Sequence, residues 1–178
     1  MRAARCPAWL SASLLLLAGC PLPQALPETV AGGTGGFGPR IAFELVAPQS
    51  TFVDVGKACA TPPRFDLHAT VVDRDQLEAV KARWFVDYHP ATNFGIARQD
   101  DAAGNGQDFL RPLPSFAYVL QDGAGEYPVH VVDLVVSNGF KDLDLSADAL
   151  PNRMPVPGRD TQTFRWVFRY VDSGGSCP

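Results

Sequence analysis

The stretch that most constrains the fold is a run of alternating side chains that follows Asp160. Every second position is aromatic, and arginine or valine stands between; the aromatic residues are Phe164, Trp166, Phe168 and Tyr170. Such alternation places successive side chains on opposite faces of an extended strand. An aromatic row of this kind could be a platform for carbohydrate. Burial of about 150–250 Å² per ring explains it without a ligand, so we predict that the row faces a core.

Shorter alternating runs precede this one, separated by clusters of proline and glycine. We expect strands at residues 41–46, 51–55, 65–71, 80–88, 115–121 and 127–137, with weaker pieces at 94–98 and 107–111 and a helical turn at 73–79. In the first of them Ile41, Phe43 and Leu45 form the alternating set. Seven to nine short strands without a long helix predict an all-β chain that folds as an antiparallel β-sandwich.

Two of these runs resemble strands of immunoglobulin-like domains. The segment 81–87 resembles the third strand, in which a tryptophan, here Trp84, fills the core. The segment 125–136 resembles the sixth strand, with Tyr127 as the candidate for the tyrosine corner, and its end also resembles bacterial polycystic-kidney-disease and cadherin-like modules. The resemblance implies an immunoglobulin-like sandwich, although neither segment carries the cysteine of the usual inter-sheet disulfide.

The N-terminal residues describe a secretory signal. Two arginines precede an apolar stretch of about ten residues that ends in small side chains, whereas a membrane-spanning helix needs about 20 apolar residues. The sequence Leu17-Ala18-Gly19-Cys20 resembles the lipobox of bacterial lipoproteins. The resemblance implies a signal peptide over residues 1–19 and lipidation, including palmitate, at Cys20. A cleaved signal with an incidental cysteine, or a buried helix, is the alternative.

The residues around the lipobox also imply a location and a domain plan. Pro21 stands where aspartate retains some lipoproteins in the inner membrane, so the resemblance implies an anchor in the cell outer membrane. Residues 20–40 are rich in proline and glycine and predict a flexible tether that spans roughly 25 Å. Residues 41–178 remain for the β-sandwich domain.

The four cysteines divide by position. Cys6 lies in the predicted signal and Cys20 at the predicted lipid site, so Cys59 and Cys177 remain. An exported chain meets an oxidising compartment, where we expect these two thiols to form a disulfide. Alternatively, Cys177 near the terminus stays free or pairs with another chain. The absence of a C-x-x-C sequence gives a thiol redox motif or zinc knuckle no support.

Charge limits the classes of partner. Without the two arginines of the signal, the chain has 13 basic and 19 acidic residues, which gives a net charge of −6. An acidic surface argues against nucleic acid, whose phosphates require a basic face. It also argues against an electrostatic hold on anionic lipid, so we expect the membrane as a partner through the lipid anchor.

No motif for catalysis or metal binding stands out. His68, His89 and His130 lack paired spacing, and neither H-E-x-x-H nor G-x-S-x-G occurs. Carboxylates gather in three loops without the EF-hand order, so solvated acidic loops explain them better than calcium does; they are Asp73 and Asp75, then Asp100, Asp101 and Asp108, then Asp142, Asp144 and Asp148. We therefore expect neither a metal nor a cofactor.

These observations predict a lipid-anchored protein of the cell envelope that acts by binding or scaffolding. An envelope protein or a glycan is the expected partner. Residues 88–94 and 138–160 are the candidate binding loops, because sandwich domains recognise partners through loops at one end. The alternatives are a carbohydrate-binding module, or an envelope hydrolase assembled from scattered residues such as His68 or His89; a deep cleft holding His, Asp and Ser would favour the hydrolase.

Overall fold

The computed structural model describes residues 38–57, 59, 61–90, 92, 95–120, 129–141, 153–172 and 174–178. Cys20, the predicted signal peptide and Tyr127 lie outside the described residues. In chain order the elements are β1 (Arg40–Ile41), the 3₁₀ helix η1 (Phe43–Leu45), β2 (Phe52–Gly56), β3 (Arg64–Leu67), β4 (Thr70–Val72), β5 (Val80–Val86), β6 (Arg98–Ala102), β7 (Leu110–Pro112), β8 (Phe116–Val119), β9 (Val129–Ser137) and β10 (Thr161–Val171).

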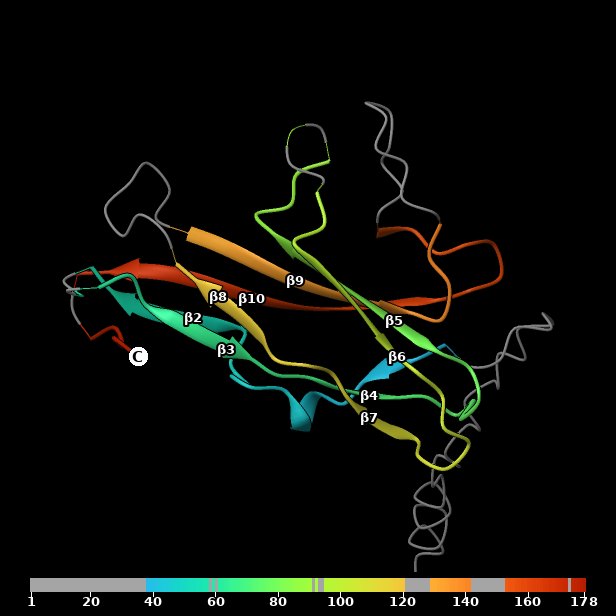
Figure 1. Ribbon diagram of the computed structural model, residues 1–178. Coiled ribbons are helices and arrows are strands. Elements are labelled where there is room, and N and C mark those ends of the chain that lie inside the picture. The colour runs from blue at the N-terminus through green and yellow to red at the C-terminus, as the bar shows by residue number, and fades with distance from the viewer. Residues whose placement is uncertain are drawn as a thin grey trace, which may run out of the picture. The chain divides into compact units, whose positions relative to one another are not determined.

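One layer of the sandwich is a five-stranded sheet in the order β2-β10-β9-β5-β6. β9 and β10 are its longest strands and run side by side in opposite directions (Figure 1), with Ser137 opposite Thr161. All of its pairs are antiparallel except β2 with β10, which is parallel. The predicted antiparallel sandwich is therefore correct apart from this one edge strand.

The second layer consists of a three-stranded sheet, β1-β4-β7, and a two-stranded sheet, β3-β8. β3 leads directly into β4 through His68 and Ala69, and β7 leads into β8 through residues 113–115. The N–H of Leu113 donates to the carbonyl of Ala69 (2.9 Å), so the two sheets continue one another. The two layers together form an all-β, immunoglobulin-like sandwich.

The core between the layers is built on the aromatic row of β10. Its four rings are at most 9% exposed, which confirms that the row faces inward and is no open platform for carbohydrate. Trp84 of β5 is fully buried and stacks on both Trp166 and Phe116, with ring centroids 5.8 and 4.8 Å away. The position that resembles the core tryptophan of the third strand therefore fills this role.

Two local predictions are wrong. Pairing with β4 stops at Ile41, and the chain turns through η1 before it joins the other sheet as β2. Phe43 and Leu45 are about half exposed, because they lie in η1, where the chain crosses from one layer to the other and no longer pairs as a strand. Residues 73–79 form bends rather than a helical turn.

The two ends of the sandwich carry different parts of the chain. β10 has 11 residues and therefore spans about 35 Å. At its first residues the backbone N–H of Ile41 donates to the side chain of Gln162 (2.5 Å). At its last residues Tyr170 lies opposite Val55, which is bridged to Ser176 of the C-terminal tail. We call the end at the first residues of β10 the tether end, because the predicted tether leads into it. The end at the last residues of β10 is called the disulfide end.

Candidate functional site

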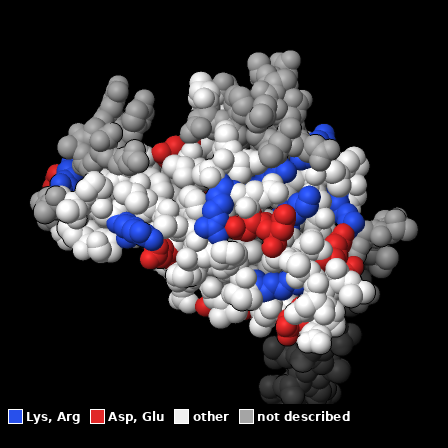
Figure 2. All heavy atoms as spheres, in the orientation of Figure 1, with Lys and Arg blue, Asp and Glu red and all other residues white. Residues whose placement is uncertain are grey.

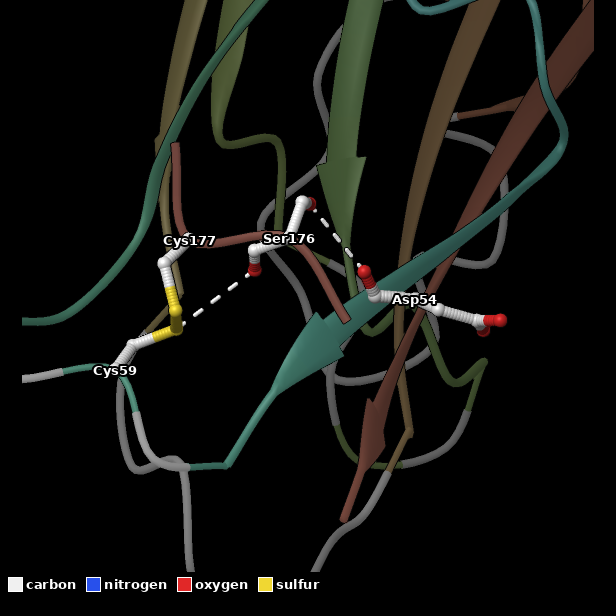
Figure 3. Close-up of a disulfide and its surroundings, with 4 residues drawn as sticks. All are labelled: Asp54, Cys59, Ser176 and Cys177. Carbon is white, nitrogen blue, oxygen red and sulfur yellow. Dashed lines mark hydrogen bonds between the residues drawn. A yellow bond between two sulfur atoms is a disulfide. The ribbon is translucent and has the colours of Figure 1, made fainter. Parts of the chain in front are cut away.

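The disulfide predicted from the cysteine positions is present. Cys59 and Cys177 are bonded, with their Cα atoms 5.6 Å apart, inside the range that a disulfide requires (Figure 3). Cys59 follows β2, and Cys177 is the penultimate residue of the chain. The prediction of an intramolecular bridge is confirmed, and the alternatives of a free or intermolecular Cys177 are wrong.

The disulfide holds the C-terminal tail against the free edge of β2. The N–H of Ser176 donates to the carbonyl of Asp54 (3.0 Å), and its own carbonyl accepts from the N–H of Gly56 (3.2 Å). A Cβ at Gly175 would lie 2.2 Å from the nitrogen of Gly56, so the approach requires glycine at position 175. The tail therefore satisfies backbone groups that an exposed edge strand would offer to another chain.

The lipidation site at Cys20 stays a prediction, because the residue lies outside the described part of the chain. Within the described ranges, no helix has the length and apolar character needed to cross a membrane.

The two candidate binding loops leave the sandwich at opposite ends. Tyr88 follows β5 at the disulfide end, whereas Asn138 follows β9 at the tether end. The expectation that both loops share one end is therefore wrong. They approach each other instead across the outer face of the five-stranded sheet, where the guanidinium of Arg153 lies 4.7 Å from the ring centre of Tyr88.

This outer face holds a second, smaller hydrophobic cluster. Phe85, Val135 and Phe140 are at most 5% exposed although they point away from the main core, and Tyr88 and Ile96 pack against them. The segment after β9 covers them by folding back on itself: Phe140 is bridged to Pro155, and the N–H of Val156 donates to the carbonyl of Gly139 (3.0 Å). We call this group, with the charged residues described next, the outer-face cluster.

A buried carboxylate organises the charges of the outer-face cluster. Asp133 is 1% exposed and accepts hydrogen bonds from Arg153 (2.8 Å) and Arg165 (2.7 and 3.0 Å). Its hydrogen bond raises the pKa of the Arg165 guanidinium. Arg153 also lies over Phe85 (5.2 Å), while Arg83 lies over Phe140 (4.3 Å). These planar cations pack on aromatic rings beside a carboxylate, so cation–π contacts and charged hydrogen bonds hold the cluster together.

The structure places the three histidines apart from one another. His68 is exposed between β3 and β4 and is bridged to Ala47 through the backbone. His89 is exposed in the loop after β5, with its Nδ1 3.1 Å from the hydroxyl of Thr92. His130 lies on β9, with its Nδ1 2.8 Å from Asp87. The described residues contain no group of three or more His, Cys, Asp or Glu side chains that could hold a metal ion.

Asp87 and His130 form a carboxylate–imidazole pair of the kind that a proton-transfer site would need, and sequence reasoning missed it. Asp87 has a left-handed backbone (φ 47°), and its second oxygen accepts the N–H of Val131 (2.7 Å). Nearby, burial raises the pKa of the Tyr118 phenol, and the charge of Asp87 adds to the effect. A phenol kept protonated donates hydrogen bonds but is a poor nucleophile, so these groups alone do not assemble a catalytic triad.

Some carboxylates of the predicted acidic loops have structural roles, and others lie outside the described residues. Asp73 is buried, and one of its oxygens accepts the N–H of Asp75 (3.0 Å) while the other lies 3.8 Å from Arg111. Asp100 accepts from the indole N–H of Trp84 (2.9 Å). The loop with Asp142, Asp144 and Asp148 lies outside the described residues. Hydrogen bonds and an arginine thus account for the carboxylates at 73 and 100.

Comparison of the chain with models of protein families, with curated proteins and with solved structures found no match.

Proposed function

We propose that this protein is a lipid-anchored module of the cell outer membrane that acts by binding or scaffolding at the envelope. Cys20 carries the acyl chains, the Pro- and Gly-rich segment tethers the domain, and an envelope protein or glycan is the partner. The lipobox-like sequence Leu17-Ala18-Gly19-Cys20 carries the first part of this proposal.

The outer-face cluster supports the second part of the proposal, that the domain binds a partner at the envelope. Arg153 brings a guanidinium over Tyr88 and Phe85, and the two loops that the sequence favoured for binding meet there. Arginine and tyrosine are the side chains that most often dominate the energy of an interface. On the face shown in Figure 2, acidic and basic side chains lie side by side without a wide basic field, which favours a protein or glycan over nucleic acid.

Site-specific photo-crosslinking in cells tests the binding surface. A photoreactive amino acid replaces Lys141, which is exposed beside the cluster and whose carbonyl accepts from Arg83 (3.3 Å). The matched control replaces Ala117, which is exposed on β8 of the other layer. We expect a discrete adduct with an envelope component from position 141 and none from position 117. Equal labelling at both positions, or none at either, would contradict a binding role for the outer-face cluster.

A further inference from the structure

Leu77 is the most exposed of the large hydrophobic side chains in the described part of the chain, at 81%. It stands on the loop between β4 and β5, at the tether end of the sandwich. Phe109 and Leu110, about half exposed, belong to the same end, because Leu110 lies opposite Val72 and the carbonyl of Phe109 accepts from Asp73. An exposed apolar tip of this kind calls for an explanation.

The loop holds the backbone of Leu77 in place. One carboxylate oxygen of Asp75 accepts the N–H groups of both Leu77 (3.0 Å) and Glu78 (3.2 Å). The N–H of Gly106 donates to the carbonyl of Gln76 (2.9 Å) from the neighbouring loop. A Cβ at Gly104 would lie 2.3 Å from the carbonyl oxygen of Leu77, so the two loops are in direct contact. Exposure of Leu77 is therefore a fixed feature of the fold rather than a result of loose packing.

Two carboxylates near the tip, Asp73 and Glu78, are buried or paired. The side chain of Asp73 is fully buried beside Arg111. Glu78 accepts from both Arg159 (2.9 Å) and Asn138 (2.8 Å). Placing this tip in an apolar medium would therefore leave these two acids with the partners they already have.

We propose that the tether end lies on the lipid bilayer and inserts Leu77 into the interfacial region, as a membrane contact additional to the acyl anchor. The inference rests on the proposed lipidation of Cys20. Only 18 positions separate Cys20 from Gly38, and a flexible chain of that length spans about 23 Å. Arg40 then pairs with Val72, the residue before the loop, so chain connectivity keeps this end closest to the anchor.

A bilayer suits the tip better than a protein does. A stable protein interface covers about 800 Å² on each partner, far more than one leucine with two half-exposed neighbours presents. A tether raises the effective concentration of a weak second contact, so a small apolar tip is sufficient at a membrane surface.

The test uses the lipidated mature protein, which begins at Cys20, in phosphatidylcholine vesicles with and without bromine on the acyl chains. The L77W variant places a fluorophore at the tip, and V119W places one at the disulfide end, where Val119 is 42% exposed. Trp84 and Trp166 give the same background in both, because each is fully buried. We expect brominated lipid to quench L77W emission at least twofold more than V119W emission.

Flotation of the vesicles separates the two proposals. If the protein fails to float, the lipid anchor and this inference both fail. If it floats but L77W is quenched no more than V119W, the bilayer contact is wrong while the anchor stands. A blue shift of L77W emission without quenching by bromine would show that protein, a second copy included, covers the tip, and would also overturn the inference.

Discussion

Removing the disulfide gives a large effect that can be worked out from the structure. Cys59 and Cys177 are 118 positions apart, so the bridge closes most of the domain into one loop. Chain-entropy reasoning assigns about 4–5 kcal/mol to a loop of this size. The tail would also lose the two backbone hydrogen bonds of Ser176, which contribute about 1 kcal/mol each. These terms together are an upper figure, and we expect the C59S/C177S variant to lose about 3–5 kcal/mol, because removal of a native disulfide typically costs about 2–5 kcal/mol.

Denaturant unfolding at fixed pH measures this loss, with the oxidised wild type as reference. Domains of this size have a free energy of unfolding of about 5–15 kcal/mol, so the variant should remain folded but with a much lower midpoint. In thermal unfolding the same loss corresponds to a decrease in Tm of about 10–20 °C. A variant within about 1 kcal/mol of the wild type, at an unchanged denaturant slope, would refute the argument from loop closure.

The same variant tests the role of the tail at the sheet edge. Without the bridge the tail loses the backbone hydrogen bonds of Ser176, and the edge groups of Asp54 and Gly56 become available. Exposed edges of this kind pair with other chains. Sedimentation velocity over a range of concentrations should show association of C59S/C177S but not of the oxidised wild type. A variant that stays monomeric throughout would show that the tail does not protect this edge.

Three further predictions concern single side chains. Gly175→Ala should destabilise the domain by about 2 kcal/mol in denaturant unfolding, because a Cβ would lie 2.2 Å from Gly56, whereas the control Gly95→Ala, with nothing within 4 Å, should change stability by less than about 0.5 kcal/mol. Asp133→Ala should cost about 3 kcal/mol because it removes the charged hydrogen bonds to both Arg153 and Arg165, and Arg165→Ala, with a side chain 54% exposed, about 1 kcal/mol because Arg153 still pairs with the carboxylate; equal losses would contradict this account. Burial raises the pKa of the Asp73 carboxyl, so the folded state binds its proton more tightly than the unfolded state does. Ionisation of this group therefore lowers the free energy of unfolding as the pH rises just above 3.8, the pKa of an ordinary aspartate. Asp73→Asn should lack that part of the slope, which urea unfolding between pH 3.5 and about 6 would reveal as a difference between the two proteins.

The alternation of apolar and polar side chains predicted most of the strands correctly, because the alternating runs were long in the strands that build the core. The aromatic row of β10 and the tryptophan of β5 face the core as their spacing predicts. The pattern failed at residues 41–46, where the chain changes sheets and Ile41 is buried but Phe43 is not. Alternation reports which side of a strand is apolar but not where pairing stops, because that depends on the partner strand.

The candidate site was less accessible from the sequence. Phe85 occupies the alternate face of β5, where alternation predicts an outward position, yet it is fully buried. The reason is the segment after β9, which folds back so that Phe140 covers the outer face. Likewise, Asp87 and His130 are 43 positions apart, and they meet because β5 and β9 are neighbours in the sheet. Such contacts depend on tertiary pairing, for which a single sequence without a motif gives no signal.

Mass spectrometry of the mature protein, extracted from membranes in detergent, tests the lipid anchor most directly. We expect the N-terminal peptide to begin at Cys20 and to carry two or more acyl chains, since one chain alone binds membranes only marginally. The Cys20→Ser variant should keep its folded domain, because the sandwich begins at Arg40, but should be released from membranes. A mature chain that starts elsewhere, or an unmodified Cys20 on a protein that stays with the membrane, would contradict the account.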